Sequence, residues 1–75
     1  MGVYELKKIF AKKKQIKFAL YNLEYIIKQV DDIVIVYPCL YETRKCMYNS
    51  LEEALHNYTV YNESIIENMD RLILL

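Results

Sequence analysis

The sequence predicts an α+β fold made of a short N-terminal helix, an antiparallel β-meander of three to four strands, and two C-terminal helices packed on one face of the sheet. Three observations support this prediction. Apolar residues recur at helical spacing near the N-terminus. The middle third is rich in β-branched and aromatic residues and is divided by turn signals. In the last third, two serines are each followed three residues later by a glutamate, which is typical of helix starts.

Length and composition predict a single domain, residues 1–75. Of the 75 residues, 55% are hydrophobic, which is enough apolar material for one core in a fold this small. No apolar run approaches the roughly 18 residues needed to span a bilayer, and no stretch near the N-terminus is typical of a signal peptide. Two cysteines fit a reducing compartment. We therefore expect a cytoplasmic protein with no membrane span.

Residues 3–13 are predicted to form an amphipathic helix. Val3, Leu6 and Phe10 fall on one face at helical spacing, and lysines occupy much of the remaining surface. A run of three lysines at residues 12–14 then interrupts the apolar pattern, so the helix is expected to end there.

The segment 15–30 fits two structures. As strands, apolar and other residues alternate from Ile16 to Leu20, and a tight turn at Asn22-Leu23 leads into the returning strand. As a helix, apolar residues at spacings of three or four continue the N-terminal helix into one rod of about 28 residues, about 42 Å long. Such a rod would need a partner chain to cover it. The aromatic and β-branched content favours strands, and the helix stays open as the alternative.

Two more strands are predicted after a turn at Asp31-Asp32. Residues 33–39 are continuous and β-branched, as in a strand buried on both faces, and Pro38 suits its end. Residues 43–48 are expected to form a shorter fourth strand.

The spacing of the two cysteines suggests a pairing. A two-residue turn at Glu42-Thr43 would place Cys39 directly across from Cys46, with their Cβ atoms within the roughly 3.5–4.5 Å that a disulfide requires. The two residues are therefore a candidate redox pair. The alternative is that both are small, partly buried apolar residues with free thiols.

Two helices are predicted to end the chain. Ser50 and Glu53 form a capping box for a helix that runs to about Tyr58. Either Asn62 or Ser64 caps the second helix. The apolar stripe of this second helix comprises Ile65, Ile66, Met69, Leu72 and Ile73.

The net charge is zero, but the two parts of the chain differ in sign. Residues 1–30 carry seven lysines against two glutamates, a net charge of +5. Residues 31–75 carry three cations against eight acids, a net charge of −5. Either the two parts face each other and cancel, or the N-terminal part presents a basic face. The candidate nucleic-acid contacts on that face are Lys7, Lys8, Lys12, Lys13, Lys14 and Lys17.

The sequence does not support catalysis. His56 is the only histidine, and no CxxC motif, HxxxH motif or carboxylate cluster stands near it. Ser50 and Ser64 are engaged as helix caps, and no glycine-rich loop is present to hold a phosphate. We therefore expect no enzyme activity, no metal site and no cofactor.

The eight tyrosines are too many for the core of so small a chain, so some are expected at the surface, where tyrosine favours protein interfaces. The C-terminal residues 72–75 are all apolar and either pack on the sheet or supply a dimer contact. The expected partner is another protein or a second copy of the chain. Candidate interface residues are Tyr21, Tyr25, Leu74 and Leu75.

Two stretches resemble a known group of proteins. One is the predicted strand–turn–strand from Phe18 to Ile27, and the other is the SLEEAL helix start at residues 50–55 followed by residues 62–67. Together they resemble small uncharacterised proteins of phages and mobile elements of low-GC bacteria, in which a β-meander precedes two helices. The resemblance covers roughly residues 16–74 and implies no known activity.

The sequence therefore predicts a non-catalytic protein–protein interaction module. The alternative is a nucleic-acid-associated regulator that uses the N-terminal lysine face.

Overall fold

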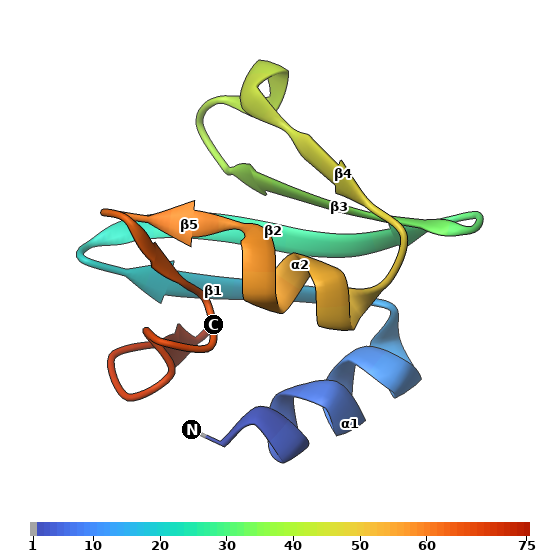
Figure 1. The fold of residues 1–75 in the computed structure, drawn as a ribbon, viewed down its shortest axis with the longest axis horizontal. Helices are drawn as coiled ribbons and strands as arrows, with labels where there is room; N and C mark the ends of the chain where they lie inside the picture. Colours follow the sequence, from blue (N-terminus) through green and yellow to red (C-terminus); the bar gives the residue numbers. More distant parts are fainter. Residues whose placement is uncertain (1) are drawn as a thin grey trace.

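A computed structural model describes residues 2–75 as an antiparallel sheet with two helices on one of its faces (Figure 1). The elements in chain order are α1 (Val3–Lys13), β1 (Gln15–Leu20), β2 (Leu23–Val30), β3 (Ile33–Pro38), the 3-10 helix η1 (Glu42–Arg44), β4 (Cys46–Tyr48), α2 (Leu51–Asn57), β5 (Thr59–Val60), β6 (Glu63–Ser64) and β7 (Ile73–Leu74). The main sheet has the order β4-β3-β2-β1-β7, and β5 and β6 form a separate small hairpin. The α+β class is therefore confirmed, with an N-terminal helix followed by an antiparallel sheet.

Residues 15–30 form the hairpin of β1 and β2, so the strand prediction is confirmed and the long-helix alternative is wrong. Helix α1 ends before the hairpin because Lys14 adopts a left-handed backbone with φ of 63° and donates its N–H to the Phe10 carbonyl at 2.8 Å. The hairpin turn lies at Tyr21-Asn22, one residue earlier than predicted, with φ of 52° and 65°. Two consecutive left-handed residues give the twist that a two-residue hairpin needs, and asparagine tolerates that conformation.

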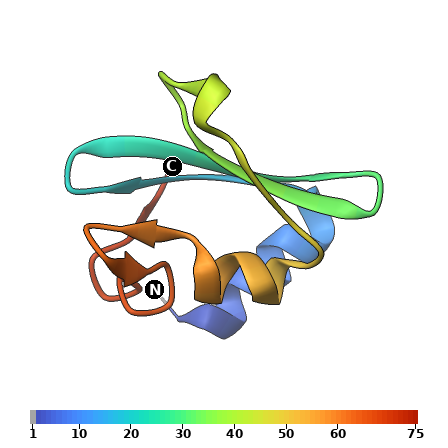
Figure 2. The ribbon, with the colours of Figure 1, turned by 45° about the horizontal axis from the view of Figure 1, so that its top comes forward.

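The register of this hairpin decides which side chains form the core. Ile16 lies opposite Ile27 and Phe18 lies opposite Tyr25, and all four are buried. Both α1 and α2 lie on this one face of the sheet, while the loop that carries η1 projects away from them (Figure 2). Other core residues are Leu6 and Phe10 of α1, Ala54 and Leu55 of α2, Val34 and Val36 of β3, and Ile65, Met69 and Leu72 near the C-terminus.

Strand β3 is buried on both faces, as its composition predicted. Val36 faces the core, whereas Ile35 and Tyr37 face the opposite side of the sheet and are still only 8% and 7% exposed. Lys28 of β2 covers part of that side, with Nζ 5.4 Å from the centre of the Tyr37 ring. No helix in the described part of the chain is both long and apolar enough to cross a membrane.

The predicted fourth strand is shortened to β4, because the turn of 3-10 helix η1 precedes it. Strand β4 pairs with β3 so that Cys46 lies opposite Val36, and Cys39 follows the end of β3. The predicted cysteine register is therefore wrong, since the connection contains a helical turn and not the two-residue turn at Glu42-Thr43. Both thiols are free.

The first predicted C-terminal helix is present as α2 and starts where its cap predicted. The Ser50 hydroxyl accepts the backbone N–H of Glu53 at 3.1 Å. The Glu53 carboxylate accepts the N–H of Asn49 at 3.5 Å, one residue earlier than a standard capping box requires. The helix start was therefore predictable from the serine alone.

The second predicted C-terminal helix is wrong: residues 65–71 are mostly turns that lead into β7. Its capping box does form, because the Ser64 N–H donates to the Glu67 carboxylate at 2.8 Å and the Glu67 N–H donates to the Ser64 hydroxyl at 3.1 Å. Beyond the box the backbone bonds are mixed. The Asn68 N–H donates to the carbonyls of both Ser64 and Ile65 at 3.1 Å, and the Met69 N–H donates to the Ile66 carbonyl, three residues back, at 3.2 Å.

The fully buried Asn68 connects the C-terminal segment to the rest of the fold. Its amide group donates to the carbonyls of Glu63 and Ser64 at 3.2 and 3.0 Å. Its Oδ1 accepts the Tyr21 hydroxyl at 2.7 Å. Asn68 thereby ties the C-terminal segment to the β1–β2 turn, and β7 then pairs with β1 at the edge of the sheet.

Replacing Asn68 by alanine should destabilise the fold strongly. Asn68→Ala removes the buried hydrogen bonds and leaves the Tyr21 hydroxyl without this partner, so we expect the free energy of unfolding to fall by about 2–3 kcal/mol. Urea unfolding followed by circular dichroism measures the change. The control is Asn57→Ala, which removes an exposed amide bonded to the Glu53 carbonyl at 2.9 Å. Equal losses from the two variants would contradict the role of Asn68.

Candidate binding groove

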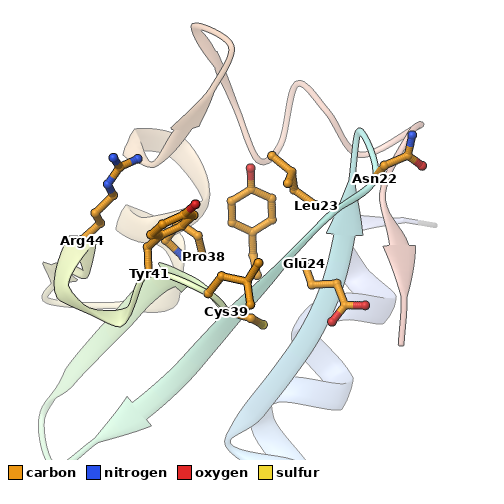
Figure 3. A pocket seen from close by; sticks show the side chains of 9 residues that line it. Asn22, Leu23, Glu24, Pro38, Cys39, Tyr41 and Arg44 are labelled. Carbon is orange, nitrogen blue, oxygen red and sulfur yellow. The ribbon is translucent and has the colours of Figure 1, made fainter.

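A groove of about 450 Å³ opens where the start of β2 faces the loop after β3. Leu23 and its neighbours of β2 lie on one side, and Tyr41 and Arg44 lie on the other (Figure 3). The lining is mostly apolar, with few charged groups. The residues that line the groove are Asn22, Leu23, Glu24, Tyr25, Pro38, Cys39, Leu40, Tyr41 and Arg44.

The groove exists because the chain leaves the sheet after β3. The Cys39 N–H still donates to the Glu24 carbonyl at 2.9 Å, but the loop then turns away. The N–H of Tyr41 donates to the Pro38 carbonyl at 2.9 Å, and the N–H of Arg44 donates to the Tyr41 carbonyl at 2.9 Å. These two successive turns hold the loop in place and separate it from the start of β2.

The sides of the groove carry large apolar side chains that are exposed to solvent. Leu40 is 83% exposed, Tyr41 is 52% exposed and Leu23 is 45% exposed. Tyr25, in contrast, is 5% exposed and belongs to the core. The groove therefore has a fixed wall at Tyr25 and solvent-exposed apolar edges.

Arg44 provides an unpaired positive charge at the edge of the groove. The guanidinium lies over the Tyr41 ring, 4.9 Å from its centre. None of the ion pairs formed by residues 2–75 involves Arg44. The other charged lining residue, Glu24, is paired with Lys17 at 3.2 Å. The groove therefore has one charge with a partner and one without.

Aromatic rings support the groove from inside the fold. Tyr25 stacks on Phe18 with ring centres 5.3 Å apart and meets Tyr58 edge to face at 6.1 Å. Tyr21 meets Tyr61 edge to face at 4.9 Å. Burial raises the pKa of Tyr58 to about 12, and burial, with a smaller effect of Tyr61, also raises the pKa of Tyr25.

The four predicted interface residues have different surroundings in the structure. Tyr25 lines the groove, but Tyr21 points to Asn68 through its hydroxyl. Leu74 packs against the core, and the 57% exposed Leu75 follows β7, which is the edge strand farthest from β4. Of the four predicted residues, only Tyr25 belongs to the groove.

The predicted lysine face is divided between two sides of the fold. Lys7 is paired with Glu52 at 2.5 Å beside α2, on the covered face of the sheet. Lys17 alternates along β1 with buried residues and so lies on the opposite face, paired with Glu24. The other four, which make no ion pair with residues 2–75, are Lys8, Lys12, Lys13 and Lys14.

His56 lies on the exposed part of α2, where its Nε2 is 3.4 Å from the Glu52 carboxylate. Within residues 2–75, no group of three histidine, cysteine or acidic side chains lies close enough to hold a metal ion. Cys39 is partly buried at the groove and Cys46 is exposed on β4.

The sequence interpretation missed Leu23, Leu40, Tyr41 and Arg44 as site residues. A signal was present, because Leu40 and Tyr41 are large apolar residues that lie between the proline ending one predicted strand and the start of the next predicted strand at residue 43. The other half of the site, Leu23, depends on the hairpin register and had no comparable local signal.

Comparisons with protein-family models, with curated proteins and with solved structures return no significant match for this chain. The function is therefore argued from the groove itself.

The raised tyrosine pKa values predict alkaline destabilisation. Tyr58 keeps its proton in the folded protein up to a pKa of about 12, whereas the unfolded chain loses it near 10. This contribution to the free energy of unfolding is complete below pH 10 and is lost as the pH rises to 12. Urea unfolding between pH 9 and 12 measures the decline, which should be smaller in Tyr58→Phe.

The control for this experiment is Tyr4→Phe, at a tyrosine that is 77% exposed, and it should keep the wild-type decline. An unchanged decline in Tyr58→Phe would contradict the assignment.

Proposed function

We propose that the protein is a non-catalytic binding module that takes a short apolar segment of a partner protein into the groove beside Tyr25. One observation carries the proposal: Leu40 and Tyr41 expose most of their side chains to water at the edge of a groove of about 450 Å³. Grooves of this size and apolar character are typical of ligand sites. A partner side chain in the groove would cover the exposed edges.

The energetics favour such a complex. Full burial of one large apolar side chain stabilises a complex by about 1.5–3 kcal/mol, and the groove offers several such side chains. Tyrosine and arginine are among the residues enriched where binding energy concentrates at protein interfaces, and Tyr41 and Arg44 lie together here. The two turns of the loop, closed by hydrogen bonds to the Pro38 and Tyr41 carbonyls, hold it in shape before binding.

Selection of short peptides from a random display library tests the proposal. We expect enriched peptides to carry one or two large apolar residues and to lose about tenfold in affinity for Tyr41→Ala or Leu40→Ser, about 1.4 kcal/mol. Fluorescence anisotropy with labelled peptides measures the affinities.

Each variant has a matched control elsewhere on the surface. Tyr4, like Tyr41, is an exposed tyrosine under a cation, with Lys8 Nζ 5.9 Å from its ring centre, so Tyr4→Ala should bind normally. Leu75→Ser controls for Leu40→Ser, because Leu75 is also exposed. If the two control variants lost binding and the groove variants bound normally, the interface would lie on another surface and the proposal would be wrong.

The nucleic-acid alternative can be tested on the same protein. Lys7 and Lys17 are ion-paired and lie on opposite faces of the sheet, so four of the six predicted lysines remain without an ion pair to contact one backbone. We expect a single-stranded oligonucleotide to bind with a Kd weaker than about 100 µM at about 0.15 M salt, measured by anisotropy. Tighter binding that is lost when Lys12, Lys13 and Lys14 are replaced by glutamine would favour the regulator instead.

A further inference from the structure

We infer that the segment bound in the groove carries an Asp or Glu side chain next to its apolar anchor, and that Arg44 binds this carboxylate. The inference rests on the proposed function and specifies the chemistry of the partner. It follows from how the charges of the groove are distributed and from how Arg44 is held.

The charges around the groove leave one positive group without a counterpart. Glu24 and Arg44 are its only charged lining residues, and Glu24 is paired with Lys17 at 3.2 Å. Arg44 forms no ion pair with any residue of the described chain, including its neighbour Glu42 on η1. A partner with an acidic side chain would supply the missing charge.

Arg44 is also positioned before a partner binds. Its backbone N–H is bonded to the Tyr41 carbonyl at 2.9 Å within η1, and its guanidinium rests over the Tyr41 ring at 4.9 Å. No hydrogen bond within the described chain engages the guanidinium N–H groups, and these groups can match both oxygens of a carboxylate. The same tyrosine forms the apolar edge of the groove, so the carboxylate and the apolar anchor would bind side by side.

The backbone of the groove favours an acidic side chain over a free C-terminus. A terminal carboxylate is typically captured by a series of free backbone N–H groups. At this groove the N–H groups of Cys39, Tyr41 and Arg44 are already bonded to carbonyls at 2.9 Å. The Arg44 side chain is the cationic donor at the groove, and it suits an acidic residue within a passing segment.

Titration of the ¹⁵N-labelled 75-residue chain with three peptides tests this inference. The first is acetyl-AFELA-amide, the second is acetyl-AFQLA-amide, and the third is acetyl-AFQL with a free C-terminal carboxylate. Amide shifts of the groove residues report the Kd for each peptide. We expect the glutamate peptide to bind about two- to fivefold more tightly than the glutamine peptide, the range of an exposed ion pair.

Variants connect this preference to Arg44. Arg44→Gln should abolish the difference between the glutamate and glutamine peptides, whereas Lys45→Gln, which removes the neighbouring cation outside the groove, should preserve it. Both positions are exposed, so both variants should fold, as the unliganded spectra will show. Higher salt should reduce the preference in the wild type.

The outcomes separate the inference from the proposed function. If all three peptides bind equally and Leu40→Ser weakens them, the inference fails and the binding module stands. If the free C-terminus binds best and this depends on Arg44, the assignment to an acidic side chain fails. If no peptide shifts the groove amides, the inference and the proposed function both fail.

Discussion

Strands β1 and β2 are joined through the two-residue turn Tyr21-Asn22, and the register set by this turn determines both the core and the groove. A slip of one residue would carry Ile16 and Phe18 to the opposite face of the sheet, because side chains alternate along a strand. The same register stacks Tyr25 on Phe18 at 5.3 Å and makes Tyr25 the fixed wall of the groove. Core packing and the candidate site therefore share one structural cause.

Features that depend on local chemistry were predictable from the sequence. The strands from residue 15 to 38 follow from aromatic and β-branched composition, and the start of α2 follows from Ser50. In each case the residues that carry the signal lie within a few positions of the structure they determine. The same applies to Asp31, a turn residue with φ of 53° between β2 and β3.

The C-terminal segment shows where local chemistry is insufficient. The capping box of Ser64 and Glu67 forms with both hydrogen bonds, yet no regular helix follows. The segment instead makes a contact that is distant in sequence, the bond between the Tyr21 hydroxyl and Asn68, two residues 47 positions apart. The groove was not predicted for a similar reason. Strand β4 pairs with β3 so that Cys46 lies opposite Val36, and this register leaves the loop between the two strands outside the sheet, where it forms one side of the groove.

The exposure of Leu40 and Tyr41 has a cost in the free protein. A chain of 75 residues is only marginally stable and needs its apolar residues inside. Leu40, at 83% exposed, adds little to folding and presents apolar surface that favours aggregation. A polar residue there would fold as well, because no core contact depends on the side chain. Burial of this apolar surface by a partner would stabilise the complex by about 25 cal/mol per Å². A binding role is therefore the simplest physical reason for Leu40 and Tyr41 to lie exposed beside a preformed groove.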